Sequence, residues 1–495
     1  MRNIKKTGLI LSILFICTLS VNAQNTFELL IENNYDEILF DVTELPDGNF
    51  ILTGTFEDPS QAWVFHGYLI KINENGVITN SVYLNEYSYC MLHNIHFYNN
   101  KLYVIAALQE NADTNFTLGL FRLNTDLEIL DVKTNVLPGN KQIGFVNSII
   151  DSDSNLVMCC AANNYNESGG FLGSDSFIYK TSMTGDSLNS IFFNEYLYKL
   201  PCGIIENNDS TGYHVFAKYC NNNYNCSKLF LNKDLEEISL VGLSSEIYTI
   251  DQALHYATQA SPIRINDSSI LLSGRYQQTN SETHFAFTMS DNDSIMSTTF
   301  IENENRIQWA NTYGNSINGN NIYSGYTSNV SYSNFYYSHD TSHIHILKFD
   351  EQLNTIWHKV IGGDAYYNLY RVLACSDGGC LLVANKFEYE DNPDEIRNIY
   401  IAKLNQDGEF VWQREFQRNS IITLFPNPAQ NTIHLNIPEN IYINGYKIFN
   451  MQGVEVINEQ NYSGSINISS LSSGTYVIEM KTNTGVISER FVKIE

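Results

Sequence analysis

Basic residues are scarce in this sequence. Lysine and arginine together number 28, against 54 aspartates and glutamates, which gives a formal net charge of −26 at pH 7. Because such a charge repels nucleic acid and anionic membranes, we predict no nucleic-acid partner. Long apolar runs are also missing after the first residues, and no segment approaches the roughly 20 apolar residues that a membrane helix needs. The sequence therefore predicts no membrane span.

The usual signatures of catalysis are missing as well. The sequence contains no Gly-x-Ser-x-Gly elbow, no phosphate-binding loop and no Cys-x-x-Cys pair. Its carboxylates are scattered, so their spacing does not single out a glycosidase pair. We therefore predict no catalytic residue, no metal ligand and no cofactor.

Three segments resemble metal sites without completing one. Asp151 to Asn155 begins like a calcium loop, but Leu156 stands where such a loop needs glycine, so we predict a hairpin turn there. The two histidine groups are His339, Asp340, His343 and His345, and more weakly His93 and His96. We interpret both groups as loop and strand-edge residues rather than metal ligands.

The first residues have the composition of a secretory signal peptide. Arg2, Lys5 and Lys6 are basic, and Leu9–Leu19 is an apolar run too short to anchor the chain in a membrane. Small residues then permit cleavage between Ala23 and Gln24. We predict a signal peptide at residues 1–23 and export of the chain.

Residues 24–420 contain a repeat, in which a polar turn leads into an apolar strand that closes on a small residue. The first copy runs from the Asp47-Gly48-Asn49 turn through Phe50 to Gly54. The seven closing residues lie 51 to 59 positions apart and are Gly54, Ala106, Cys160, Ala217, Gly274, Gly325 and Ala384. A second landmark, an apolar-Lys-apolar segment ending in Asn or Asp, is clearest at Leu69–Asn73, Ile346–Asp350 and Ile401–Asn405.

Four short strands in each of seven units are typical of a β-propeller. A single four-stranded sheet cannot bury both of its faces, whereas radial stacking buries each sheet against the next. We therefore predict an all-β chain with a seven-bladed β-propeller in which the seven small residues are equivalent. Phe27–Ile31 is expected to pair with the last blade and close the ring. The repeat resembles the blades of secreted bacterial propellers, and two stacked β-sandwiches are the alternative architecture.

Residues 421–495 have the pattern of a small all-β module. Thr432–Ile437 alternates with period two, as a half-buried strand does, and Gly453 lies in a turn between two apolar segments. Several short strands at close spacing predict a small β-sandwich of the immunoglobulin-like type. A small adhesion module would show the same strands, so the strands alone do not assign a function.

The landmarks of this module resemble, in order, the type A C-terminal sorting domain of the type IX secretion system: Pro426-Asn427-Pro428, Gly453, Gly474-Thr475-Tyr476 and Lys493. The resemblance implies that the secretion machinery is a partner of the chain. It also implies passage through the periplasm and across the outer membrane of a Bacteroidetes-type bacterium, to the cell surface or the medium. Removal of the module, between Phe416 and Phe425, and attachment of the remainder to lipopolysaccharide are further implications.

Eight cysteines follow the predicted signal peptide, and an even number permits disulfides in an exported chain. Cys375 and Cys380 flank one turn, and Cys220 and Cys226 bracket one short loop, so we predict these two pairs as disulfides. Free buried cysteines are the equal alternative. The adjacent Cys159-Cys160 pair points to opposite faces of one strand and is a poor disulfide.

Two classes of function stay open for the propeller. In the first, it is a non-catalytic module that binds a glycan or a protein on its loop-lined face. In the second, it is a secreted carbohydrate-active hydrolase or lyase with its site at the mouth of the central channel. We prefer the first, because it needs no catalytic constellation. An exposed aromatic platform would favour binding, and convergent carboxylates or histidines would favour catalysis.

Overall fold

The computed structural model describes residues 25–32, 35–57, 64–111, 115–137, 141–165, 171–193, 199–221, 223–242, 254–256, 262–278, 281–289, 295–301, 314–328, 341–388, 396–410, 423–437, 442–450, 454–462, 464–482 and 485–494. All regular elements within these ranges are β-strands. No helix in the described part of the chain has the length and apolarity to cross a membrane. Ala23, Gln24, His339, Asp340 and Gly453 lie outside these ranges.

Most strands before residue 410 form antiparallel sheets in chain order, which we number as blades. Blade 1 contains β2 (Asp36–Glu44), β3 (Phe50–Glu57), β4 (Phe65–Ile72) and β5 (Ile78–Leu84), and blade 2 contains β6 (Tyr89–Tyr98), β7 (Lys101–Gln109), β8 (Thr117–Leu123) and β9 (Ile129–Val136). Blade 3 contains β10 (Lys141–Ile150), β11 (Asn155–Tyr165), β12 (Phe171–Ser182) and β13 (Ser187–Phe193), and blade 4 contains β14 (Lys199–Glu206), β15 (Gly212–Asn221), β16 (Asn223–Asn232) and β17 (Glu237–Gly242).

The later blades follow the same plan with two variations. Blade 5 contains β18 (Leu254–Tyr256), β19 (Ile263–Asn266), β20 (Ser269–Gln278), β21 (Ser281–Met289) and β22 (Ile295–Ile301), with β18 and β19 both paired to β20. Blade 6 contains β23 (Asn315–Asn318), β24 (Asn321–Ser328), β25 (His343–Phe349) and β26 (Thr355–Gly362). Blade 7 joins β27 (Tyr366–Ala374), β28 (Cys380–Phe387) and β29 (Asn398–Leu404) to the N-terminal β1 (Phe27–Ile31).

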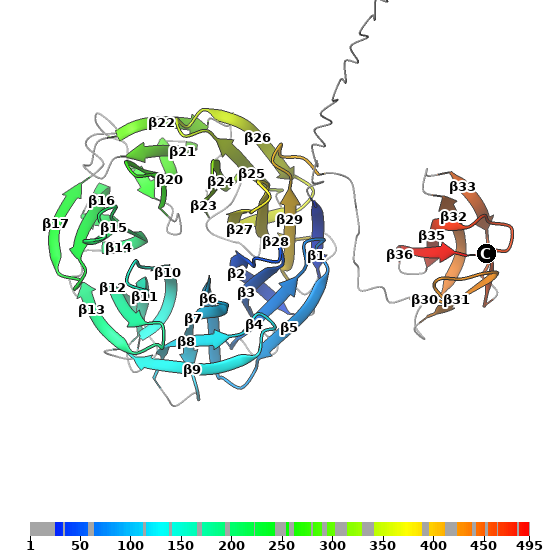
Figure 1. The fold of residues 1–495 in the computed structure, drawn as a ribbon, viewed down its shortest axis with the longest axis horizontal. Helices are drawn as coiled ribbons and strands as arrows, with labels where there is room; N and C mark the ends of the chain where they lie inside the picture. Colours follow the sequence, from blue (N-terminus) through cyan, green and yellow to red (C-terminus); the bar gives the residue numbers. More distant parts are fainter. Residues whose placement is uncertain are drawn as a thin grey trace, which may run out of the picture.

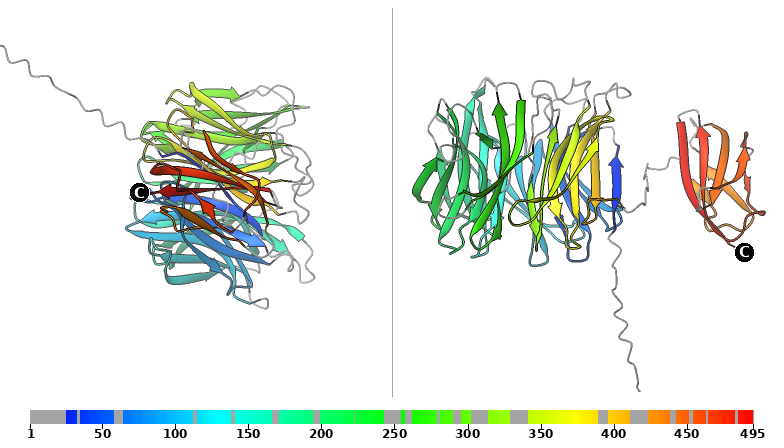
Figure 2. Two further views of the ribbon diagram at one scale, coloured as in Figure 1. Left: turned by 90° about the vertical axis from the view of Figure 1, so that its right-hand side faces the viewer. Right: turned by 90° about the horizontal axis from the view of Figure 1, so that it is seen from above.

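The blades surround a common axis (Figure 1). First strands such as β2, β6 and β10 lie nearest the centre, and fourth strands such as β5, β9 and β13 lie at the outer rim. Seen edge-on, the strands run between the two faces of the ring (Figure 2). The predicted β-propeller is confirmed, and the described residues contain seven such sheets. The blade count of the whole chain stays a prediction, because stretches such as 302–313 and 329–340 lie outside those residues.

Burial explains why the sheets stack radially. One core cluster joins Val157 and Ile178 of blade 3 to Val215 and Leu229 of blade 4, and all four side chains are almost completely buried. Equivalent clusters join blade 1 to blade 2 and blade 6 to blade 7. Each buried side chain of this size contributes roughly 1.5–3 kcal/mol relative to exposure. A blade therefore depends on its neighbours for most of its stability.

Strand β1 closes the ring across almost the whole propeller sequence. It pairs antiparallel with β29, with Phe27 opposite Lys403 and Ile31 opposite Ile399. Blade 7 therefore takes its outer strand from the N-terminal end, as the sequence predicted. The pairing covers an edge of β29 that would otherwise be open to other chains.

The two faces of the ring carry different connections. The turn face holds the tight turns Leu45–Asn49 and Asn73–Val77 of blade 1 and their counterparts in other blades. The loop face lies at the opposite ends of the strands, where β2 and β4 begin and β3 and β5 end. Several connections on the loop face are longer than the turns, including residues 329–342 between β24 and β25.

In five of the described blades, the Asn or Asp that follows the third strand caps the following turn. Asn73 Oδ1 accepts hydrogen bonds from the backbone N–H groups of Asn75 (3.0 Å) and Val77 (2.9 Å). Gly76 takes the left-handed φ of 81° that the turn requires. The same pair of capping bonds recurs at Asn124, Asn232, Asp350 and Asn405. The Asn or Asp of the sequence repeat is therefore a turn cap.

The repeated lysine joins neighbouring blades. Lys71 Nζ of blade 1 donates to the Thr125 carbonyl of blade 2 at 2.8 Å. Lys180 and Lys348 reach the equivalent turn carbonyls of the next blade at 3.2 and 3.0 Å. In blade 7, Lys403 bonds the carbonyl of Asn25, just before β1, at 3.0 Å. The Lys of the apolar-Lys-apolar pattern thus forms a hydrogen bond to the next blade.

Six of the seven predicted small residues occupy one register. Gly54 lies four positions after Phe50, which pairs with Ile72, the residue just before the capped turn. In five other blades, the residue four positions after the equivalent pair is Ala106, Cys160, Ala217, Gly274 or Ala384. In blade 6 the count reaches Tyr326, so the equivalence predicted for Gly325 is wrong by one residue.

The exception in blade 6 has a packing reason. A Cβ on Gly54 would lie 2.8 Å from the ring of its partner Tyr68, so the large residue of that pair is on the third strand. In blade 6 the large residue is on the second strand instead. Tyr326 stacks on its partner His345, with ring centroids 4.4 Å apart and planes 11° from parallel.

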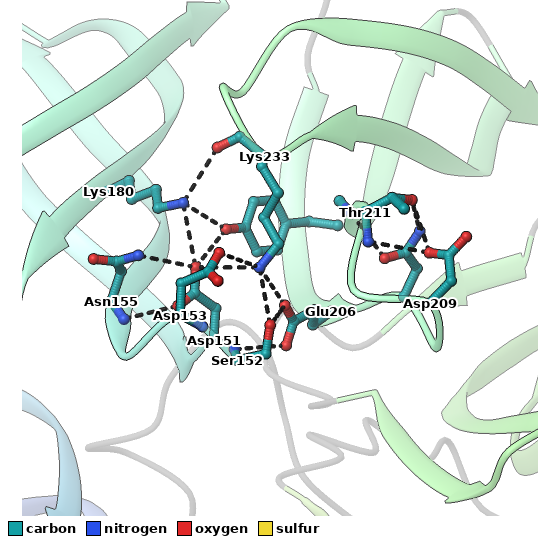
Figure 3. Close-up of polar contacts among 12 residues, drawn as sticks. Asp151, Ser152, Asp153, Asn155, Lys180, Glu206, Asp209, Thr211 and Lys233 are labelled. Carbon is teal, nitrogen blue, oxygen red and sulfur yellow. Dashed lines mark hydrogen bonds and ion pairs between the residues drawn. The ribbon is translucent and has the colours of Figure 1, made fainter.

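A buried charge network joins blades 3 and 4 on the turn face (Figure 3). Asp151 is completely buried, and its Oδ1 caps the turn by accepting from the N–H groups of Asp153 and Asn155. Its Oδ2 accepts from the Tyr213 hydroxyl at 2.6 Å and lies 3.2 Å from Lys180 Nζ. The segment that begins like a calcium loop is therefore the hairpin turn that the sequence predicted, with its carboxylate held by protein groups.

The C-terminal strands form two sheets around one core. The first sheet contains β30 (Thr423–Phe425), β31 (Thr432–Asn436) and β34 (Ile466–Asn467). The second contains β33 (Glu455–Glu459), β32 (Ile443–Asn450), β35 (Gly474–Thr482) and β36 (Gly485–Lys493). Ile433 of the first sheet and Ile448 and Ile478 of the second are fully buried in the same cluster. This arrangement is the β-sandwich predicted from the sequence.

The Asp151 network predicts a large and pH-dependent effect of one substitution. Burial alone would raise the pKa of Asp151, but the Tyr213 hydroxyl, the Asn155 N–H and the Lys180 ammonium hold it below its usual value. We expect Asp151→Asn to lower the free energy of unfolding by about 3 kcal/mol at pH 7, because Lys180 loses its buried partner. Chemical denaturation of the full-length protein measures this difference.

The matched control is Asp153→Asn, whose carboxylate is 61% exposed and should contribute less than about 1 kcal/mol. Since the folded-state pKa of Asp151 is lowered, its contribution is present above roughly pH 4 and is lost as the pH falls through that pKa. The gap between wild type and Asp151→Asn should shrink below about pH 4. Equal losses in the two variants at pH 7 would contradict the assigned role of Asp151.

Candidate functional site

The innermost strands of blades 7, 1 and 2 place polar residues at one level of the ring. Arg371, Asp41 and Asn94 each follow a bulge in β27, β2 and β6. Arg371 Nε lies 3.1 Å from Asp41 Oδ1, and Asp41 Oδ2 accepts from Asn94 Nδ2 and from the Ile95 N–H. The Asp41 side chain is only 5% exposed. This carboxylate therefore links three blades.

The weaker histidine group of the sequence belongs to the same strands. His93 occupies the bulge of β6, is buried, and its ring lies 5.2 Å from that of Phe40 in the bulge of β2. His96 Nε2 lies 2.7 Å from Ser148 Oγ of blade 3. Desolvation lowers the pKa of each histidine to about 4, so both are neutral at pH 7. They serve as packing and hydrogen-bonding groups between blades.

The stronger histidine group is only partly described, because residues 329–340 lie outside the structure's described ranges. His345 is buried, its Nε2 lies 2.8 Å from Ser328 Oγ, and its Nδ1 lies 2.9 Å from His358 Nε2. Burial first, and then His358 and His343, lower the pKa of His345 to about 3. Within the described residues, no three His, Cys, Asp or Glu side chains are arranged to hold a metal ion.

The predicted Cys375–Cys380 disulfide is wrong. Both cysteines are free, because Cys380 pairs across the hairpin with Ala374 while Cys375 begins the turn. They pack in different clusters, Cys375 with Leu381 and Cys380 with Leu382. The two thiols therefore lie on opposite sides of blade 7.

The second predicted disulfide stays a prediction, because the side chains of Cys220 and Cys226 are outside the described part. Cys220 pairs with Tyr224 and Cys226 pairs with Lys218, so the two cysteines are diagonal neighbours in their hairpin. Diagonal Cα atoms are about 7–8 Å apart, which is beyond the usual disulfide span. As predicted, Cys159 and Cys160 pack in separate clusters on opposite faces of β11.

An aromatic cluster lies where the strands of blade 1 reach the loop face. It contains Tyr35, which precedes β2, Phe56 near the end of β3, His66 and Tyr68 on β4, and Tyr83 on β5. Tyr35 is 40% exposed and Tyr83 is 44% exposed, whereas Phe56 is 5% exposed. The Phe56 centroid lies 4.9 Å from Tyr35 and 5.8 Å from Tyr83. We name these five residues the tyrosine cluster.

Sequence reasoning missed the tyrosine cluster, because its members come from three strands and one connection and form no local motif. Projecting the blade repeat onto one register would have placed most of them at the same end of blade 1. Within the cluster, Tyr35 and Tyr83 expose apolar ring surface on the loop face.

The motif residues of the C-terminal sandwich meet at one place. Pro426, Asn427 and Pro428 are exposed and follow β30, and the peptide bonds before both prolines are cis. Asn427 Oδ1 accepts a hydrogen bond from the Val492 N–H at 2.9 Å. Ala429 then forms backbone hydrogen bonds with Val492 and Ile494 on and beyond β36. The first motif is thus bound to the last strand of the chain.

The remaining motif residues lie on the same strand pair. Gly474 of β35 is opposite Lys493 of β36, and the Tyr476 ring stacks on Phe491 with centroids 5.6 Å apart. The Tyr476 hydroxyl donates to the Ser472 carbonyl at 2.9 Å. Lys493 is buried and donates to the Ile494 carbonyl at 2.6 Å. Gly453 lies outside the described residues.

Comparison with protein families gives one match, to the secretion system C-terminal sorting domain, at residues 423–495. The match begins at β30 and covers both sheets of the sandwich. No curated protein matches the chain.

Solved structures give remote matches. An acylaminoacyl peptidase from Pyrococcus horikoshii is 11% identical at a TM-score of 0.40, covering 71% of this chain and 51% of its own, so the chain spans about half of that protein. The β-propeller domain of the trilobed protease from Pyrococcus furiosus is 8% identical at 0.41, covering 77% and 100%. A protein from Bacteroides uniformis described as a putative 6-phosphogluconolactonase is 9% identical at 0.37, covering 65% and 87%. Likenesses this remote carry no functional information.

The family match and the geometry of the sandwich agree on the C-terminal segment. The motif residues that are far apart in the sequence are joined through β36, and the matched residues are the ones that fold into the two sheets. Residues 423–495 are a C-terminal sorting domain of the type IX secretion system, and this domain directs the chain across the outer membrane to the cell surface or the extracellular space.

Proposed function

We propose that the exported propeller is a non-catalytic module that binds a glycan or a protein on its loop face. The observation that carries this proposal is the tyrosine cluster, in which Tyr35 and Tyr83 expose 40% and 44% of their surface beside three further aromatic or imidazole rings. Single exposed apolar residues are ordinary, but a group of large rings on one face is typical of a recognition surface.

The inner wall of the propeller supports binding over catalysis. The carboxylate of Asp41 is used by Arg371, Asn94 and a backbone N–H. His93 and His345 are buried, with pKa values lowered to about 4 and about 3. General acid–base catalysis works best when the pKa of the group is near the working pH. These groups are better suited to holding blades together than to transferring protons.

The remaining assignments complete the proposal. Residues 1–23 are the signal peptide, with cleavage between Ala23 and Gln24, and residues 24–420 are the propeller. The sorting domain begins at residue 421 and is removed within the segment between Phe416 and Phe425. The propeller then stays on the surface, attached to lipopolysaccharide, or is released into the medium.

We expect the full-length protein to bind polysaccharides or surface proteins without changing them. A glycan array run beside a hydrolysis screen on the same polysaccharides checks both parts of this statement. Retention of a ligand with no new reducing or unsaturated ends is the expected result. New ends, abolished by heat denaturation, would refute the non-catalytic role and favour a hydrolase or lyase.

Deleting Leu424–Glu495 should stop export. The blades bury their faces against one another, so the truncated protein should still fold. It should accumulate in the periplasm, while the complete chain reaches the surface or the medium, as fractionation and immunoblotting would show. Equal export of the truncated protein would mean that residues 421–495 are not needed as an address. As a test of sufficiency, the same residues fused to an unrelated periplasmic cargo should carry it out of the cell.

The buried histidines predict a loss of stability in mild acid. A histidine whose folded-state pKa is lowered stays neutral in the fold, while the unfolded chain takes up a proton below about pH 6.5. The free energy of unfolding should therefore fall as the pH drops from about 6.5 towards 4. In His345→Gln the slope should be smaller by about 1.4 kcal/mol per pH unit. Denaturation curves at several pH values measure both slopes, and identical slopes would show that folded His345 takes up a proton.

A further inference from the structure

We propose that the tyrosine cluster of blade 1 is a binding site for an uncharged polysaccharide. The inference rests on the proposed binding function and deepens it by naming the residues and the class of ligand. Its first support is the arrangement of the rings. Tyr35 and Tyr83 both pack against Phe56, with centroid distances of 4.9 and 5.8 Å, and we call these three rings the row. Tyr35 and Tyr83, which are 40% and 44% exposed, offer apolar ring surface to the C–H faces of sugar rings, while the buried Phe56 packs against both.

The backbone of blade 1 holds this row in place. Tyr68 lies across Gly54, where a Cβ would meet its ring at 2.8 Å, and it stacks on Tyr83 with centroids 6.2 Å apart. Tyr68 is fully buried and also contacts Phe56, whose centroid is 6.2 Å away. The exposed Tyr83 therefore rests on a rigid support. Rigid aromatic side chains lose little conformational entropy when a ligand binds.

Two polar atoms beside the row have no hydrogen-bond partner. They are the hydroxyl of Tyr68 and Nδ1 of His66, and both are buried. The His66 ring lies 5.2 Å from that of Phe56. Buried polar atoms are nearly always paired, and each unpaired one costs about 1–3 kcal/mol. Sugar hydroxyls both donate and accept, so they are of the chemical type that would pair these two atoms if ligand binding opened a path to them.

The charge around the cluster selects an uncharged ligand. Burial is the largest cause that raises the pKa of Tyr68 and of Tyr83, and the carboxylate of Glu37 is the second largest. Glu37 is itself only 1% exposed. The whole chain has a formal net charge of −26. An anionic polysaccharide would meet repulsion from both sources. A cationic side chain of a protein is the competing ligand, but Tyr35 and Tyr83 expose two separate rings and one ammonium group covers a single ring face.

The double variant Tyr35→Ala/Tyr83→Ala tests the site in the full-length protein. Both residues are substantially exposed, so the fold should be kept, and an unchanged melting curve checks this. Binding to neutral polysaccharides, with laminarin, xyloglucan and galactomannan as the probes, should weaken about tenfold or more in affinity electrophoresis. Tyr35→Phe/Tyr83→Phe keeps the rings and should keep most of the binding. Tyr442→Ala removes an exposed tyrosine of the sorting domain and should change nothing.

The outcomes separate the inference from the proposed function. If wild type binds a neutral polysaccharide and the double Ala variant binds it equally, the site is wrong and the binding function stands. If wild type retains polygalacturonate or polylysine but none of the neutral probes, the class of ligand is wrong. Cleavage of any probe would instead overturn the non-catalytic function on which the inference rests.

Discussion

The fold depends on one constraint, which is that no blade can bury its two faces alone. Clusters such as the one joining Val157 to Val215 show that the apolar core lies between sheets rather than within them. The polar contacts follow the same boundaries. Lys71 and its counterparts cross to the next blade, and Asp151 is buried at the contact of blades 3 and 4. Ring closure by β1 extends this neighbour relation to the last sheet.

Much of this architecture could be predicted from the sequence, because each blade repeats the same local pattern. A polar turn, an apolar strand and a capping Asn or Asp recur at regular spacing, and each has a local physical cause. Prediction failed where the partner strand decides the outcome. Gly325 looked equivalent to Gly54, but the register of β25 places Tyr326 there and its partner is His345. Cys375 and Cys380 looked close in sequence, but the hairpin directs them to opposite sides.

The two candidate sites differ in the same way. The sorting motif could be found in advance because its residues recur in a fixed order within one short segment, although only the fold shows that Asn427 binds β36. The tyrosine cluster could not be found, because Tyr35, Phe56 and Tyr83 are separated by turns and loops and come together only where β2 begins and β3 and β5 end on one face. Its proposed role depends on exposure and on unpaired atoms, which no sequence pattern encodes.

The pairing of β1 with β29 also sets a limit on when the propeller ring can close during synthesis of the chain. The N-terminal strand leaves the ribosome first, yet its partner, Asn398–Leu404, is made only after every other blade. Until β29 has been synthesised, β1 has no partner strand and the ring of blades cannot close. The entropy cost of bringing such distant segments together grows only slowly with chain length. Pairing of β1 with β29 therefore cannot occur before Asn398–Leu404 has been synthesised.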